Sequence, residues 1–182
     1  MWEYDELEAT SENQSHDTDL VGDPMQEETT ADITRIYIQN LNGLNWNHDG
    51  GKWQYVCDVV ETIQADISCF SELNTNTNKY EVRHKMESIC QQRFPQNSLV
   101  MASSKYNTST AYKPGGTAIL AKNAITACIT SHTRDRMGRW VSIRITTVSS
   151  RKIRIISAYQ VCNSRTSGTN TAAAQQRSQL IE

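Results

Sequence analysis

The first 32 residues lack lysine and arginine entirely, although they contain eleven aspartate and glutamate residues. They also lack hydrophobic periodicity, which argues against an amphipathic helix or a strand there. A secretory signal is excluded because residues 1–10 (MWEYDELEAT) have neither a basic start nor an apolar core. We therefore expect residues 1–32 to be a disordered acidic leader and residues 33–182 to form one domain.

The cysteines form no C-x-x-C pair and no cluster with histidine at zinc-ligand spacing. They are odd in number and widely spaced, at Cys57, Cys69, Cys90, Cys128 and Cys162. This pattern favours a reduced, intracellular setting, with the nucleus as one option. No apolar run approaches the roughly 18 residues that a membrane span needs, so we expect no membrane association.

Basic residues are concentrated behind the acidic leader. All 18 lysines and arginines lie in residues 33–182, against nine acidic residues, which gives this part a formal charge of +9. Such a balance suits a polyanionic partner such as nucleic acid. A solvated basic surface that only aids solubility would give the same composition.

The first half of the domain alternates strand and helix patterns. Apolar and β-branched runs predict buried strands at 33–40 (ITRIYIQN), 67–70 (ISCF) and 98–103 (SLVMAS). Apolar residues at steps of three and four predict helices over 52–63 and 79–94, and Pro95 ends the second helix.

The second half is richer in strands. We expect them at TAILAK (117–122), ITACITS (125–131), RWVSIRITTV (139–148) and KIRIISAYQV (152–161), and a helix beginning at 171 after a polar loop over 163–170. The order predicts an α/β domain with parallel and antiparallel strand pairs, covered by helices on one side and by another sheet on the other.

Two polar residues stand where predicted strands end. Asn40 follows RIYIQ and Glu72 follows ISCFS. Ligand sites form outside the carboxyl ends of strands, and Mg²⁺ needs only one or two protein carboxylates. Taken singly, each residue is more often an ordinary turn or loop residue.

Four segments in order resemble the endonuclease/exonuclease/phosphatase superfamily. They are IQNLNGLN with the following helix and ADISCFSELN, then PGGTAIL, then MGRWVSIRI, then IRIISAYQV. The sequences SELNTNT and ISAYQVC are most similar to the endonuclease domains of non-LTR retrotransposon reverse transcriptases. The resemblance implies a four-layer α/β sandwich, of which this chain would hold only the N-terminal portion.

The resemblance also implies a Mg²⁺-dependent phosphodiesterase that acts on DNA or another phosphodiester, with Mn²⁺ as a substitute cation. Glu72 would hold the metal, Asn40 would orient the scissile phosphate and the attacking water, and Tyr159 would direct its hydroxyl at the phosphate. Arg139 would contact the nucleic-acid backbone, although it could equally be an exposed strand-end arginine. The sequence does not identify a protein partner.

The sequence departs from the family pattern in two ways. Ser71 and Leu73 flank Glu72 where the family commonly has glutamine and threonine, and no proline follows Tyr159 closely. The family's Gly-Asp-x-Asn segment and its later aspartate–histidine pair are also missing, since only Asp135, His84 and His132 follow Glu72. We therefore expect a truncated domain that is inactive alone, exposes sheet edges and apolar faces, and is poorly soluble.

The alternatives are a non-catalytic nucleic-acid-binding module, a vestigial retroelement fragment, and an enzyme of the same family acting on a phosphorylated lipid or sugar.

Overall fold

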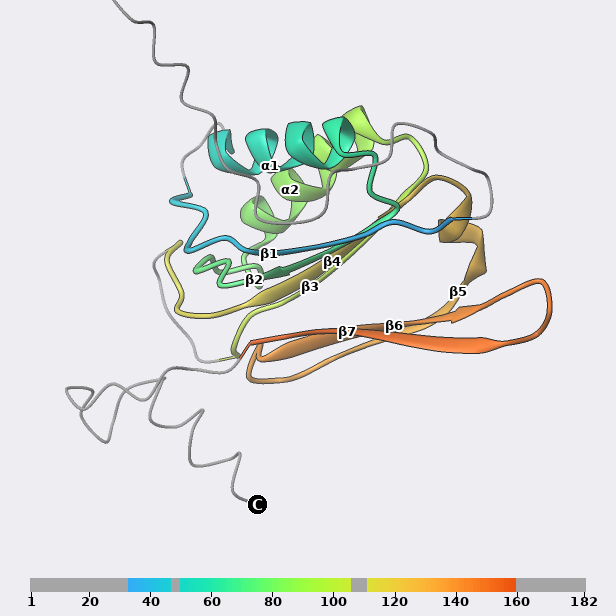
Figure 1. Cartoon of the computed structure of the whole chain (residues 1–182). Helices are drawn as coiled ribbons and strands as arrows, with labels where there is room; N and C mark the ends of the chain where they lie inside the picture. Colours follow the sequence, from blue (N-terminus) through green and yellow to red (C-terminus); the bar gives the residue numbers. More distant parts are fainter. Residues whose placement is uncertain (1–32, 47–49, 106–110, 160–182) are drawn as a thin grey trace, which may run out of the picture.

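The computed structural model describes residues 33–46, 50–105 and 111–159, so the predictions for the leader, for the loop over 163–170 and for the helix from 171 lie outside the described residues. The described chain forms three layers: a pair of helices, a mixed sheet beneath them, and a second sheet beneath that (Figure 1). This is the α/β arrangement that the sequence predicts.

The first sheet has the strand order β1-β2-β4-β3. Among the described strands of this sheet, β1 pairs with β2 in parallel, whereas β4 runs antiparallel to both β2 and β3. The strands are β1 (Ile36–Asn40), β2 (Ile67–Ser71), β3 (Asn97–Ala102) and β4 (Thr117–Lys122). Consequently β1, β2 and β3 all finish at one end of the sheet.

The second sheet is an antiparallel meander in the order β5-β6-β7. Its strands are β5 (Ile129–Arg134), β6 (Trp140–Thr146) and β7 (Lys152–Ala158). Val141, Ile143 and Ile145, at alternate positions of β6, are buried. The predicted strand over 125–131 is wrong in its first part, because Asn123–Cys128 forms a short 3-10 helix before β5 begins. His132, which follows the predicted strand over 125–131, lies within β5.

Two helices cover the first sheet on the face opposite the second sheet (Figure 1). They are α1 (Gly51–Thr62) and α2 (Tyr80–Arg93), within one residue of the predicted ranges at each end. Trp53 of α1 packs edge-on against Phe70 of β2, with 5.5 Å between ring centroids. Among the described residues, no helix is long and apolar enough to cross a lipid bilayer.

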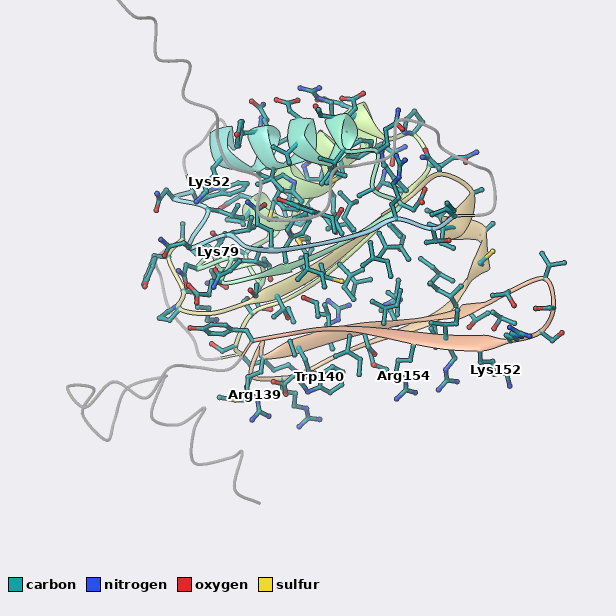
Figure 2. All side chains as sticks on the ribbon, in the orientation of Figure 1. Lys52, Lys79, Arg139, Trp140, Lys152 and Arg154 are labelled. Carbon is teal, nitrogen blue, oxygen red and sulfur yellow. The ribbon has the colours of Figure 1, made fainter. Side chains whose placement is uncertain are left out.

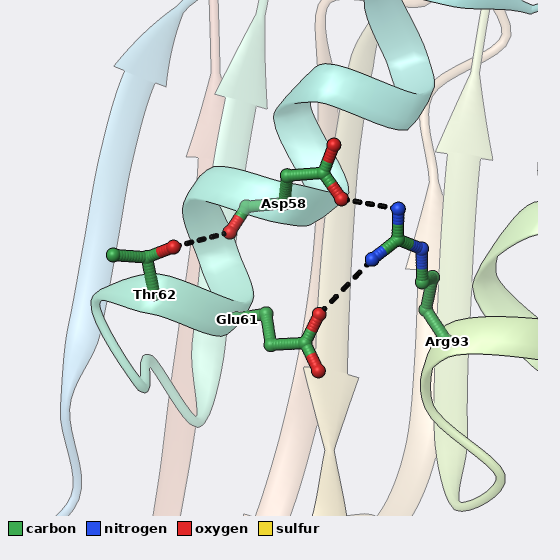
Figure 3. A network of polar contacts seen from close by, with 4 residues as sticks. All are labelled: Asp58, Glu61, Thr62 and Arg93. Carbon is green, nitrogen blue, oxygen red and sulfur yellow. Dashed lines mark hydrogen bonds and ion pairs between the residues drawn. The ribbon is translucent and has the colours of Figure 1, made fainter.

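A polar network joins the ends of the two helices (Figure 3). Arg93 of α2 pairs with Asp58 and Glu61 of α1, and Thr62 donates a 2.9 Å hydrogen bond to the carbonyl of Asp58. These groups are substantially exposed, so each pair contributes at most about 1 kcal/mol. The buried apolar faces supply most of the stabilisation of the two helices.

Strand β1 differs from its prediction as a buried strand. It is an edge strand of the first sheet, and Ile36 and Ile38 are 52% and 77% exposed. Their register partners Ile67 and Cys69 belong to the apolar cluster between the two sheets. The described part of the second sheet packs over β2, β3 and β4 and not over this face of β1.

Candidate metal and phosphate site

The carboxyl ends of β1 and β2 bring the first two predicted site residues together. The strands are parallel, and their register pairs Asn40 with Ser71, the residue before Glu72. The Nδ2 amide of Asn40 donates a 2.9 Å hydrogen bond to Oε1 of Glu72. Asn40 and Glu72, each expected at the end of a strand, therefore lie in contact.

A second hydrogen bond fixes which way the Asn40 amide faces. Its Oδ1 accepts a 2.9 Å hydrogen bond from the backbone N–H of Asn42. This leaves the amide nitrogen toward Glu72, with a second N–H that can donate to a ligand. Asn40 thus orients one carboxylate oxygen of Glu72 and leaves the other oxygen available.

The backbone at Glu72 is held in the left-handed region, at φ +52°. Such a conformation is uncommon for a residue with a side chain and persists only where neighbours enforce it. The Glu72 carbonyl accepts a 2.7 Å hydrogen bond from Gly43, and Leu73 N–H donates to Gly116 at 3.3 Å. The loops after β1 and before β4 therefore hold Glu72 from both sides.

Lys52 is a supporting residue that the sequence did not single out. Its Nζ donates to the carbonyls of Leu41 and Gly43, at 2.6 and 2.7 Å. Charge-assisted bonds of this kind are stronger than neutral ones. Lys52, from the first turn of α1, thereby ties the loop that follows Asn40 to the helix.

The loop after Glu72 is braced against the segment that precedes β4. Asn74 and Gly115 exchange hydrogen bonds, Asn74 N–H to the Gly115 carbonyl at 2.7 Å and Gly115 N–H to Asn74 Oδ1 at 2.8 Å. Lys113 is only 3% exposed, and burial lowers the pKa of its ammonium group. No pattern at sequence level distinguished Lys113 from an exposed loop lysine.

Tyr159 lies at the same end of the sandwich as Glu72. Its backbone N–H donates a 2.7 Å hydrogen bond to the Arg139 carbonyl. Two residues earlier, the Ser157 hydroxyl donates a 2.9 Å hydrogen bond to the carbonyl of Phe70, which is two residues before Glu72. Ser157 is buried between the sheets, and its hydrogen bond joins β7 to β2. The role predicted for the Tyr159 hydroxyl stays a prediction.

Arg139 has a different environment from the exposed phosphate contact that the resemblance implies. Its Nε donates to Asp135 Oδ2 at 2.8 Å, and the two side chains are only 16% and 11% exposed. Burial acts to raise the pKa of Asp135, but the hydrogen bonds and charge of Arg139 hold that pKa below its usual value. The pair closes the loop between β5 and β6, and contact of Arg139 with nucleic acid stays a prediction.

The residues at the ends of β1 and β2 fit a hard divalent cation that keeps most of its water. Glu72 offers one oriented carboxylate, and Mg²⁺ is commonly bound through one or two carboxylates together with substrate phosphates. Across residues 33–46, 50–105 and 111–159, no three His, Cys, Asp or Glu side chains gather closely enough to enclose a metal. These residues therefore fit a cation that is bound jointly by the protein and a substrate phosphate, and not a closed structural metal site.

Comparison with solved structures finds several chains of related architecture. The AP endonuclease LMAP from Leishmania major superposes with a TM-score of 0.53 at 16% identity, covering 70% of this chain and 40% of that protein. The 3′ phosphatase NExo from Neisseria, bound to a product DNA hairpin, gives 0.50 at 15%, with 81% and 48% covered. An endonuclease/exonuclease/phosphatase family protein from Leptotrichia buccalis gives 0.50 at 14%, with 82% and 64% covered.

No protein-family model and no curated protein matches the sequence. The chain spans between 40% and 64% of the length of the three similar structures. At identities of 14–16% the likeness concerns the fold. The described residues thus have the architecture of part of an endonuclease/exonuclease/phosphatase-type α/β sandwich.

Proposed function

We propose that this chain carries the metal-binding side of a divalent-cation-dependent phosphodiesterase that acts on nucleic acid. The observation that carries the proposal is the hydrogen bond from Asn40 to Glu72 at the adjoining ends of two parallel strands. A carboxylate oriented in this way at a strand end suits a cation that is shared with a phosphate.

Each residue of the site has a separate task in this proposal. Glu72 would hold Mg²⁺ or Mn²⁺, which when bound neutralises charge on the phosphate oxygens and the leaving group. Asn40 keeps the carboxylate oriented and donates its second N–H to a phosphate oxygen. Lys52 holds the loop that follows Asn40, and Tyr159 contributes its hydroxyl from the end of β7.

Nucleic acid is the substrate class that we favour over a phosphorylated lipid or sugar. The residues after the leader carry a formal charge of +9, which matches a polyanion. One similar structure is described as an AP endonuclease, and another as a phosphatase bound to a DNA hairpin. Within this class, the segments around Glu72 and Tyr159 favour a retrotransposon-type endonuclease that acts inside the cell.

Cleavage of supercoiled plasmid by the full chain tests the proposal. With Mg²⁺ and excess protein, we expect little nicking by the chain acting alone, and any nicking should be abolished by Glu72→Gln and left unchanged by Glu81→Gln, because Glu81 is an exposed helix residue. Nicking that survives in Glu72→Gln would contradict the role of Glu72.

A non-catalytic nucleic-acid-binding module is the second candidate. It is favoured by the pairing of Asp135 with Arg139, because Asp135 is the only aspartate after Glu72 and is not free to act as a proton acceptor. In that case the wild-type chain retains DNA in a salt-dependent manner and does not nick it. We propose this state for the chain acting alone, with the missing acid–base groups supplied by other residues in an active enzyme.

A further inference from the structure

A groove runs beside β3, the edge strand of the first sheet opposite β1. The register of β5 pairs His132 and Arg134 with Ile143 and Val141, whose side chains point toward the first sheet. His132 and Arg134 therefore point to the same side, next to β3. At the carboxyl end of β3 the groove widens to a recess of about 370 Å³, lined in part by Asn78, Lys105, Arg134 and Arg136.

Three cations surround this recess without a carboxylate to pair with. Lys105, Arg134 and Arg136 are exposed, and among the described residues none of them forms a salt bridge. The backbones of Lys105 and Arg136 are joined by a 3.0 Å hydrogen bond, so these two side chains start from adjacent positions. Like charges gathered in this way are unfavourable unless an anion binds between them.

The single carboxylate in the lining of the recess is already neutralised. Asp135 lies between Arg134 and Arg136 in sequence, but its oxygens accept hydrogen bonds from the side chain and backbone of Arg139. The loop from Arg134 to Arg139 thus directs its negative charge inward and leaves its two other arginines at the groove. The recess is basic because of this internal pairing.

The structure places the recess at the functional end of the sandwich. β3 ends beside β4 at Thr117, and Thr117 also pairs with Ser71, the residue before Glu72. The side chain of Asn78 donates a 2.8 Å hydrogen bond to the Ser104 carbonyl, which joins the loop after Glu72 to the end of β3. An anion in the recess would therefore lie at the same strand ends as Glu72, on the other side of β4.

The neighbouring part of the groove has a different charge. A smaller recess of about 120 Å³ shares Met101 and Arg134 with the first, and adds Arg83 together with Glu87. Its mixture of charges makes it a poorer anion site. The attraction for an anion is accordingly greatest at Lys105, Arg134 and Arg136.

From these observations we propose that Lys105, Arg134 and Arg136 bind backbone phosphates of a nucleic acid whose scissile phosphate lies at Glu72. The inference rests on the proposed function for its ligand. It defines the path of the nucleic-acid backbone over the protein, from the end of β2 across β4 to β3. It is a contact to the phosphate backbone, so it adds affinity without base specificity.

The test measures DNA binding in the absence of metal, in the Glu72→Gln background, so that cleavage plays no part. The full-length groove variant Lys105→Gln/Arg134→Gln/Arg136→Gln is compared with Arg144→Gln/Lys152→Gln/Arg154→Gln. The control removes the same charge from the outer face of the second sheet, where Figure 2 shows Lys152 and Arg154 away from the first sheet. Binding of a labelled 20-base-pair duplex is followed by fluorescence anisotropy between 50 and 300 mM salt.

Loss of three phosphate contacts lowers the slope of log affinity against log salt by about 3 in the groove variant. The control variant should change that slope by less than about 1. Equal losses in the two variants, a larger loss in the control, or no salt-dependent binding by the parent chain would each overturn the inference. Arg136→Gln alone, expected to lower the slope by about 1, repeats the comparison should the triple variant fail to fold.

These outcomes are separable from those of the plasmid assay. Binding through the groove, together with nicking or Mn²⁺ binding that Glu72→Gln leaves unchanged, would support the phosphate path and contradict the proposed metal site. Nicking that depends on Glu72 but is indifferent to the groove variant would do the reverse.

Discussion

The side-chain amide of Asn40 lies 2.9 Å from a carboxylate oxygen of Glu72, although 32 positions of sequence separate the two residues. The parallel pairing of β1 with β2 creates this contact, and the hydrogen bond from Asn42 N–H to Asn40 Oδ1 sets its direction.

Asn40→Ala should weaken metal binding more than it weakens the fold. A neighbour that orients a metal ligand typically contributes 10–100-fold to affinity, and one hydrogen bond contributes about 1 kcal/mol to stability. We expect a drop of that size in Mn²⁺ affinity, measured by electron paramagnetic resonance with a DNA duplex present. Asn97→Ala, which removes an amide from the opposite end of β3, serves as the control and should leave the affinity unchanged. Equal affinities in wild type and Asn40→Ala would show that the contact does not support the site.

Lys52→Met should destabilise the domain by about 2–3 kcal/mol, because it removes charge-assisted hydrogen bonds to two partly buried carbonyls. Urea denaturation followed by tryptophan fluorescence measures the change. Lys152→Met, an exposed lysine near the β6–β7 turn (Figure 2), should change the midpoint little. A Lys52 variant as stable as the Lys152 variant would show that the loop after Asn40 needs no such support.

Asp135→Asn should destabilise the domain by about 3 kcal/mol at pH 7, since it leaves the Arg139 charge inside without its partner. The pKa of Asp135 is lowered in the folded state, so its contribution is complete above the ordinary pKa of about 3.9 and is lost as pH falls through the folded value. Thermal melting of wild type and variant from pH 7 down to pH 3 should show the difference narrowing only at the acid end. A difference independent of pH would contradict an ionised pair.

Ile38→Lys should reduce self-association of the full chain. Ile36 and Ile38 present apolar side chains on an open edge strand, and such edges promote aggregation unless charged or covered. Light scattering at increasing protein concentration should show smaller assemblies for Ile38→Lys than for wild type. Val148→Lys adds the same charge to a fully exposed position away from that strand. An equal reduction of self-association by Val148→Lys would show that net charge, and not the edge strand, controls self-association.

Much of this fold follows from local sequence patterns, and the exceptions have physical causes. The helices around Trp53 and Met86 were predicted within one residue at each end because their apolar spacing repeats at 3.6 residues. The segment RIYIQ reads as buried, yet β1 is an edge strand, and burial depends on neighbours that a single segment does not encode. ITACITS was misassigned because β-branched residues also fit a short 3-10 turn when tertiary contacts require one.

Part of the candidate site could likewise be predicted from the sequence, and part could not. Asn40 and Glu72 could be predicted because strand ends in a parallel pair must meet. Lys52, Lys113 and Ser157 could not, since each is defined by a contact with backbone or side chains distant in sequence. Arg139 was expected at the surface, but its side chain pairs with Asp135 because the loop between β5 and β6 closes on itself.

The most direct test of the account is whether Glu72 binds a divalent cation together with a phosphodiester. Mn²⁺ titrated into the full chain with a short DNA duplex, followed by electron paramagnetic resonance, should show one bound ion in the wild type and in Glu81→Gln. Glu72→Gln should lose that ion while keeping the melting temperature of the wild type. Mn²⁺ binding of equal affinity and stoichiometry in Glu72→Gln would contradict the central claim that this carboxylate forms the metal side of a phosphodiesterase site.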